Sequence, residues 1–275
     1  MGNWTLDDIP WERFDRAKVD PDLLRIVKAA SLVEQNGADY ARYLCGVFHD
    51  DAEFQRVARC WGEEEIQHGQ ALGRWAMLAD STFDHAEACR RFSAGFRVDL
   101  DAERSVRGSR SGELVARCIV ETGTSSYYTA LADASAEPVL QAICRRIAAD
   151  ELRHYKLFYT HLKRYLEAER VGFWGRLRVA AGRVGESEDD ELAYAYYAAN
   201  ENVAENAAPY ERAQCARSYA RRAYAVYRQH HVERVVAMIF KTVGLRPHGR
   251  LSFAVARLAW WGMRRRARRL AKDAA

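Results

Sequence analysis

Apolar residues recur three and four positions apart along most of the chain, the spacing that places them on one face of a helix. Ile143, Ile147, Phe158 and Leu162, for example, share such a face, while polar residues fill the opposite one. No segment shows a convincing alternation of apolar and polar positions, so the pattern predicts an all-α protein. The predicted helices span residues 21–48, 50–79, 83–96, 112–134, 136–170, 188–203 and 208–243.

The helices of the first 170 residues have the lengths and connections of a ferritin-like bundle. The connections at 48–51 and 134–138 are short enough for antiparallel hairpins, whereas residues 80–111 are long enough to cross the bundle. Two hairpins joined by one crossover make the ferritin-like topology rather than the up-down-up-down one. We therefore expect an N-terminal arm (1–20), a ferritin-like four-helix bundle (21–170), additional packing helices (171–245) and a basic amphipathic tail (246–275).

Two copies of the motif Glu-x-x-His lie in these helices. One pairs Glu65 with His68, and the other pairs Glu151 with His154. Residues three apart share a helix face, so each motif presents a carboxylate and an imidazole to the same point. One such pair alone is weak evidence, because chance predicts roughly 0.6 such pairs in a chain of this composition.

A single glutamate on an otherwise apolar or small-residue face precedes each motif. Glu34 stands 31 residues before Glu65, and Glu121 stands 30 residues before Glu151. The spacing indicates an internal duplication of a helix pair that supplies Glu and then Glu-x-x-His. Four carboxylates and two histidines from four helices are the ligand set of a carboxylate-bridged di-iron or di-manganese centre.

The electrostatic cost of burying these side chains supports a metal site. Four carboxylates facing one core would repel each other and lose hydration, at several kcal/mol each unless neutralised. Two divalent cations would balance the four negative charges. Oxygen ligands with one imidazole per metal suit iron or manganese better than zinc. The alternative is that the six residues lie on solvated helix faces or form protonated pairs in a core.

Residues next to these six fit a supporting role. Glu64 and Asp150 each precede a motif glutamate, so each half offers an acid that orients the imidazole of the other half, or else a solvated acidic position. The hydroxyl of Thr124 either lies beside the metals to deliver protons or bonds back to its own helix. Several glycines near the motifs indicate close helix packing or room for a substrate. They are Gly62, Gly69, Gly73 and Gly123.

Three segments resemble the soluble acyl-carrier-protein desaturases of the ferritin-like di-iron superfamily. RVARCWGEEEIQHGQALGRW is similar to their W-x-x-EE-x-x-HG run, and RRIAADELRHYKLFY to their A-x-DE-x-RH run. VETGTSSYYTAL resembles the intervening helix, with Glu121 at the ligand position and Thr124 at the threonine on the oxygen side. The resemblance covers roughly residues 20–170. Rubrerythrins, aldehyde-deformylating oxygenases and bacterial ferritins share the same arrangement of metal ligands.

The resemblance implies a division of roles. Glu34 and His68 would be terminal ligands of one iron, Glu121 and His154 of the other. The remaining two glutamates, Glu65 and Glu151, would bridge. A pair of irons is favoured over a manganese–iron pair. The implied activity is dioxygen-dependent desaturation or other oxidation of a fatty-acyl chain, with acyl carrier protein as the candidate carrier. A non-enzymatic iron-oxidising protein and a bundle that its metals merely hold together are the competing interpretations.

Composition and charge add the expected partners and compartment. No C-x-x-C pair or Gly-rich dinucleotide motif is present, so electrons must come from a separate, ferredoxin-like donor. The start of the chain lacks the apolar run of a signal peptide, which favours the cytoplasm, and we expect a homodimer. His230 and His231 have no glutamate at ligand spacing and are interpreted as surface residues.

The positive charge of the chain is concentrated at its end. The net charge is +4, yet residues 246–275 hold nine Lys/Arg and one Asp, which leaves the remainder mildly acidic. This basic tail suits an anionic membrane surface, a dock for an acidic carrier protein, or a helix packed on the body with solvated arginines. Nucleic-acid binding is not expected, because no recognition motif accompanies the charge.

Overall fold

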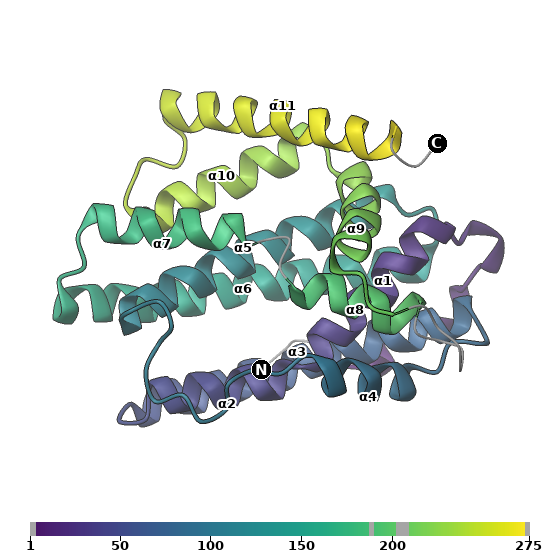
Figure 1. Cartoon of the computed structure of the whole chain (residues 1–275), viewed down its shortest axis with the longest axis horizontal. Helices are drawn as coiled ribbons and strands as arrows, with labels where there is room; N and C mark the ends of the chain where they lie inside the picture. Colours follow the sequence, from purple (N-terminus) through teal and green to yellow (C-terminus); the bar gives the residue numbers. More distant parts are fainter. Residues whose placement is uncertain (1–3, 187–189, 202–208, 273–275) are drawn as a thin grey trace.

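The computed structural model describes residues 4–186, 190–201 and 209–272. All regular secondary structure in these ranges is helical, which confirms the all-α prediction (Figure 1). The α-helices are α1 (Pro21–Gln35), α2 (Gly37–Val47), α3 (Ala52–Ala79), α4 (His85–Gly95), α5 (Arg110–Ala134), α6 (Pro138–Glu169), α7 (Phe173–Gly185), α8 (Asp190–Asn200), α9 (Arg212–Val226), α10 (Gln229–Val243) and α11 (Arg250–Lys272).

The first hairpin pairs α1 and α2 with the long helix α3. Asp20 begins α1 by accepting hydrogen bonds from the two backbone N–H groups of the first turn, and Pro21 supplies a preset helical φ. The single helix predicted over 21–48 is wrong, because the chain divides at Asn36 into α1 and α2. At this point the backbone lies so close to α3 that a side chain at Gly37 would meet the carbonyl of Gly62 at 2.9 Å.

The second hairpin is formed by α5 and α6, which lie side by side (Figure 1). Ser109 caps α5, and Glu137 caps α6 ahead of Pro138 in the first turn. Helix α4 and the irregular residues 96–109 connect the two hairpins, as expected for a long crossover. Four helices, α1, α3, α5 and α6, therefore face one another as in a ferritin-like bundle.

The C-terminal helices cover the sides of the bundle. Helix α8 packs against α1, α4 and α9, while α10 packs on α5 and α11 lies over α9 and α10. The prediction missed α7, whose sequence carries three glycines, and it merged α9 and α10 into one helix over 208–243. The backbone is extended at Tyr227 and Arg228, with no glycine or proline to signal the break.

Two apolar clusters lie one beyond the other along the bundle, and a polar layer separates them. On α3, Ala71–Ala79 belong to one cluster and Phe54–Trp61 to the other. On α6, residues up to Ala148 belong to the first and those from Tyr155 to the second. Both Glu-x-x-His motifs fall in the interval between. The fold thus buries the charged residues in a layer that is closed by hydrocarbon at both ends.

Candidate metal centre

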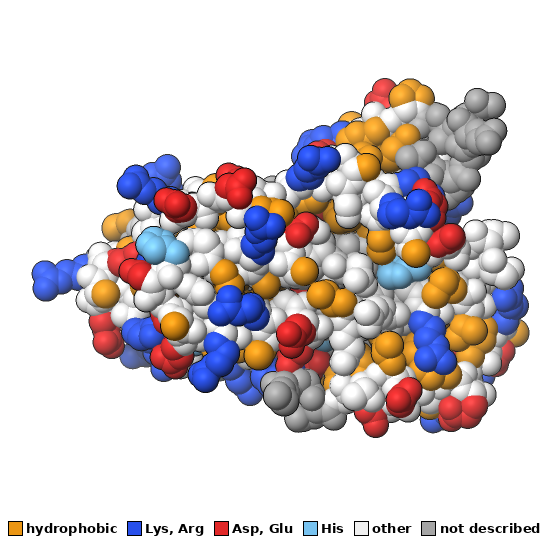
Figure 2. Space-filling view, turned by 90° about the horizontal axis from the view of Figure 1, so that it is seen from below, with side chains coloured by type: hydrophobic (Ala, Val, Ile, Leu, Met, Phe, Trp, Pro, Cys, Tyr) orange, Lys and Arg blue, Asp and Glu red, His pale blue; other side chains and the backbone are white. Residues whose placement is uncertain are grey.

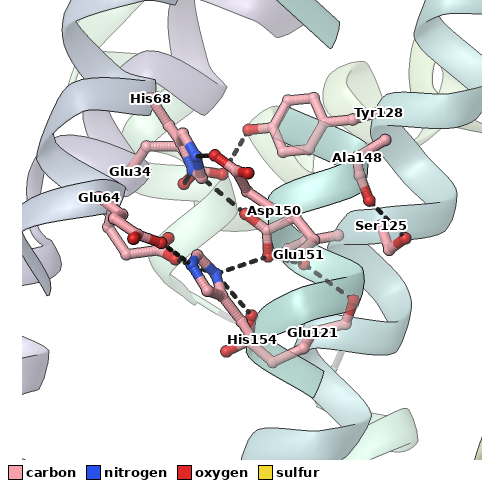
Figure 3. A network of polar contacts seen from close by, with 12 residues as sticks. Glu34, Glu64, His68, Glu121, Ser125, Tyr128, Ala148, Asp150, Glu151 and His154 are labelled. Carbon is pink, nitrogen blue, oxygen red and sulfur yellow. Dashed lines mark hydrogen bonds and ion pairs between the residues drawn. The ribbon is translucent and has the colours of Figure 1, made fainter. Parts of the chain in front are cut away.

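The six predicted ligands converge in the polar layer from four helices (Figure 3). None is more than 9% exposed, so the alternative of solvated helix faces is excluded. They come from α1 (Glu34), α3 (Glu65 and His68), α5 (Glu121) and α6 (Glu151 and His154).

The six side chains form two groups of four that share two carboxylates. The first group is Glu34, Glu65, His68 and Glu151, and the second is Glu65, Glu121, Glu151 and His154. In the first, His68 Nδ1 lies 3.5 Å from Glu34 Oε2 and 3.3 Å from Glu151 Oε1. In the second, His154 Nδ1 lies 3.0 Å from Glu65 Oε1 and 3.6 Å from Glu121 Oε2.

Each of the six side chains has at least one buried polar atom without a hydrogen-bond partner among the described residues. These atoms are Glu34 Oε2, Glu65 Oε1, His68 Nδ1, both carboxylate oxygens of Glu121, Glu151 Oε1 and His154 Nδ1. A buried polar group without a partner costs about 1–3 kcal/mol, and a charged one costs more. All these atoms point into the same layer. Metal ions bound between them would give every one of these atoms a partner, so the residues present fit a metal site. Iron and manganese fit this oxygen-rich donor set.

The electrostatics of the layer also call for added positive charge. Burial, together with repulsion from Glu151, raises the pKa of Glu65 well above the usual glutamate value and that of Glu121 to about 8. Burial would lower the pKa of His68 and His154, but the surrounding carboxylates hold both well above the usual histidine value. Protons therefore neutralise the layer when no cation does, and divalent cations would displace them.

Two acids outside the layer contact the ring nitrogens that face away from it. Each acid lies on the opposite hairpin from the imidazole that it contacts. Asp150 of α6 lies 3.1 Å from Nε2 of His68 on α3, and Glu64 of α3 lies 2.6 Å from Nε2 of His154 on α6. Burial opposes ionisation of both acids, but the histidines and a neighbouring arginine, Arg153, bring the pKa of each to about 2. With Nε2–H donated to a carboxylate, Nδ1 is left to face the layer. This is the arrangement expected from the sequence.

Three further residues support this arrangement and were not predicted. The guanidinium of Arg153 donates to both Asp150 and Glu64, and so couples the two outer acids. The indole of Trp4 donates to Asp150 Oδ2 at 2.8 Å and stacks on the His68 ring at 6.0 Å between centroids. Trp4 lies far from both motifs in the sequence, so no spacing could have indicated it.

Tyr128 is the third unpredicted contact. Its hydroxyl donates a hydrogen bond to Glu34 Oε1 (Figure 3). Tyr128 stands on the same face of α5 as Glu121, so helical spacing placed it near the layer. Its contact with Glu34 on α1 could not be predicted, because that contact depends on how the two hairpins pack together.

Thr124 reaches the layer while also bonding to its own helix. Its hydroxyl lies 2.6 Å from Glu151 Oε2 and 3.3 Å from two backbone carbonyls of the preceding turn. Beside it, a Cβ on Gly123 would meet nothing within 4 Å, whereas one on Gly62, Gly69 or Gly73 would meet heavy atoms at 2.5–2.6 Å. Three of the four glycines thus serve close packing, and Gly123 borders open space.

Asp133, His230 and His231 form another acid–histidine group, and here the surface interpretation is wrong for one member. His231 is only 1% exposed, whereas the His230 side chain is 59% exposed. The backbone N–H of Arg228 donates to His231 Nδ1, so Nε2 carries the proton and donates to Asp133 at 3.1 Å. Both ring nitrogens are therefore used: Nδ1 caps the start of α10, and Nε2 connects it to the end of α5. This group is structural rather than a metal site.

Comparison with protein-family models gives a match over the central part of the chain. The sequence model described as fatty acid desaturase matches residues 42–172. This range includes both Glu-x-x-His motifs, Glu121 and Thr124, but it begins after Glu34 and ends before α7. No curated protein was found to match the chain.

Proposed function

We propose that the protein, whose residues 42–172 match the fatty acid desaturase family model, is an oxidoreductase that introduces a double bond into a fatty-acyl chain at a di-iron centre. Two bound iron ions would supply the activation of dioxygen. The overall reaction removes two hydrogens from adjacent carbons and, with two electrons from an external donor and two protons, reduces dioxygen to two waters. The acyl chain, on acyl carrier protein, is the substrate class that the resemblance favours.

The buried atoms without partners are the observation that carries this proposal. Glu34 and His68 would hold one ion, and Glu121 and His154 the other. Glu65 and Glu151 belong to both groups of four, as two bridging carboxylates must. A donor set with one imidazole per site suits iron, and a manganese–iron pair is the alternative that metal analysis would reveal.

The residues of the chain orient the metal ligands, hold a proton beside them and exclude water from the layer. Asp150 and Glu64 fix the imidazoles so that Nδ1 faces the layer. The Thr124 hydroxyl holds a proton 2.6 Å from Glu151, next to the open space at Gly123, where it can pass that proton toward the layer. The apolar clusters at both ends exclude water, which strengthens every electrostatic interaction between them.

Reconstitution of the full chain with ferrous iron tests the proposal. We expect two iron ions per chain, and dioxygen consumption that yields a dehydrogenated product from one member of a panel of acyl substrates when an electron donor is supplied. The Glu121→Gln variant should lose product formation, whereas Glu63→Gln, at an exposed neighbour of the motif, should not. Iron oxidation that never depends on an acyl substrate would instead identify an iron-handling protein. Tightly bound iron without either reaction would identify a structural centre.

A further inference from the structure

The last helix of the chain, α11, lies on the outside of the molecule over α9 and α10 (Figure 1). Its inner face packs Ala256, Trp260 and Met263 against apolar residues of α10. Its outer face also carries large apolar side chains. Leu251 is 60% exposed, Leu258 69% and Trp261 61%.

These three residues form one outward stripe, because positions i, i+7 and i+10 fall on the same side of a helix. Most large hydrophobic residues of the chain are buried, so three on one exposed stripe are a concentrated apolar surface. The stripe is convex and follows a single straight helix of roughly 35 Å, from 1.5 Å per residue. An open hollow of about 590 Å³ adjoins it, but the described residues that line the hollow all belong to α11 itself, so it is a notch along one basic helix rather than a cleft between elements.

Cations surround the stripe. The helix contains eight basic residues and no acidic one: Arg250, Arg257, Arg264, Arg265, Arg266, Arg268, Arg269 and Lys272. The Arg265 guanidinium lies 5.4 Å from the Trp261 ring, so charge and aromatic surface are adjacent. The opposite face of the molecule, seen from below in Figure 2, carries acidic and basic side chains intermixed. With eight basic residues and no acidic one, α11 differs from this mixed face.

We propose that α11 binds the surface of an anionic lipid bilayer, with its axis parallel to the membrane plane. Leu251, Leu258 and Trp261 would enter the boundary between headgroups and acyl chains, and the arginines would contact lipid phosphates. A flat, deformable surface accommodates a convex helix face in which apolar and cationic groups alternate. No helix in the described part of the chain is long and apolar enough to cross a bilayer, so the contact is peripheral. This inference is independent of the oxidation chemistry proposed above.

Vesicle co-sedimentation of the full chain tests this surface. Binding is expected with vesicles of phosphatidylcholine and phosphatidylglycerol but not with phosphatidylcholine alone, and added salt should weaken it. The Arg265→Gln/Arg269→Gln variant should lower the partition coefficient about 25-fold, since each basic residue near an anionic surface contributes a factor of roughly five. The Leu258→Ser/Trp261→Ser variant should lower it about tenfold or more through lost apolar burial.

Controls on α3 match both kinds of change. Arg56→Gln and Met77→Ser alter exposed residues of α3, a helix that lies across the bundle from α11 (Figure 1), and should leave vesicle binding unchanged. All four altered positions of α11 are exposed, so circular dichroism and thermal unfolding should match the parent chain. The proposal is overturned if anionic vesicles do not bind, if neutral vesicles bind equally, or if the apolar variant binds like the parent. Polyglutamate that binds as tightly and blocks vesicles would overturn it too, in favour of an acidic protein partner.

Discussion

At the scale of single residues, the orientation of each imidazole is set by an acid from the opposite hairpin. His154 can present Nδ1 to the layer only while Nε2–H is donated to Glu64, and Arg153 keeps that carboxylate ionised and in place. The same relation holds between His68 and Asp150. The preorganisation of the centre therefore depends on residues that do not themselves face the layer.

Glu64→Gln is expected to lower metal affinity about 10- to 100-fold, because loss of an outer hydrogen-bond partner weakens the orientation and basicity of the ligand it holds. Competition of Co²⁺ or Fe²⁺ with a chelator measures the change. The matched control is Glu63→Gln, which makes the same chemical change at an exposed position one residue away. Equal affinities in the two variants would show that Glu64 plays no positioning role.

The residues that the sequence could predict are those whose partners are helical neighbours or duplicated copies. The two Glu-x-x-His motifs and the nearly equal spacing of Glu34 and Glu121 before them predicted a convergence that the structure brings about. Trp4 could not be predicted, since its contact with Asp150 spans 146 residues. Nor could the burial of His231, which depends on Asp133 of another helix.

At the scale of elements, backbone proximity decides where helices begin, end and cross. Helices α1 and α2 lie so close to α3 that only glycine fits at several contacts, and the Asn-Gly pair at 36–37 was a local signal of the break between them. The break between α9 and α10 has no such signal. It requires the His231 contacts with α5, which no local pattern contains.

Gly69→Ala and Gly123→Ala should have opposite effects on stability, although both place alanine inside a helix. A Cβ at Gly69 would lie 2.6 Å from the backbone nitrogen of Gln35, which cannot move aside, so overpacking should cost about 1–3 kcal/mol. At Gly123 nothing lies within 4 Å, and alanine should stabilise by up to about 1 kcal/mol through helix propensity. Urea unfolding of both variants measures the difference, and equal effects would contradict the close α1–α3 packing.

The ion pair between Lys28, in the middle of α1, and Asp80, at the end of α3, should make stability depend on pH. The ammonium of Lys28, 2.6 Å away, lowers the pKa of Asp80 to about 2. A lowered carboxyl pKa gives stability that is complete above the unfolded value near 4 and is lost as the pH falls toward 2. Asp80→Asn should therefore cost about 1–2 kcal/mol at pH 7, discounted for the partial exposure of the pair.

By pH 3 this cost should fall to roughly half, because the parent chain has begun to protonate Asp80 in the unfolded state. Urea unfolding at the two pH values checks the change. Asp101→Asn, at a side chain that is 96% exposed, is the control and should change stability little at either pH. An Asp80→Asn cost that is the same at pH 7 and pH 3 would rule out the ion pair as its source.

At the scale of the whole molecule, two apolar clusters enclose a charged layer to which four helices contribute. Both apolar clusters contain residues from both hairpins, and the charged layer likewise forms only when α1, α3, α5 and α6 are all in place. Metal ions bound there would link both hairpins, so the energy of binding is also energy of folding. The C-terminal helices, which no motif predicted in detail, cover the bundle and lie outside the layer.

Loss of the ions is therefore expected to lower the melting temperature of the entire chain. An ion present at about 100 times its Kd adds ~2.7 kcal/mol to the native state, and two such sites add ~5 kcal/mol. For a large domain this corresponds to roughly 10–20 °C. Calorimetry of the chain loaded anaerobically with ferrous iron, before and after chelation, measures the difference.

The Glu65→Gln variant separates metal linkage from ordinary packing. Glutamine keeps the shape of the side chain and carries no charge, so the metal-free variant should melt close to the metal-free parent, whose layer protons neutralise. Its gain on adding iron should be largely lost, because Glu65 belongs to both groups of four. If iron raises the melting temperature of parent and variant equally, the ions bind somewhere other than this layer. A variant that melts much lower without iron would show that Glu65 acts chiefly in packing.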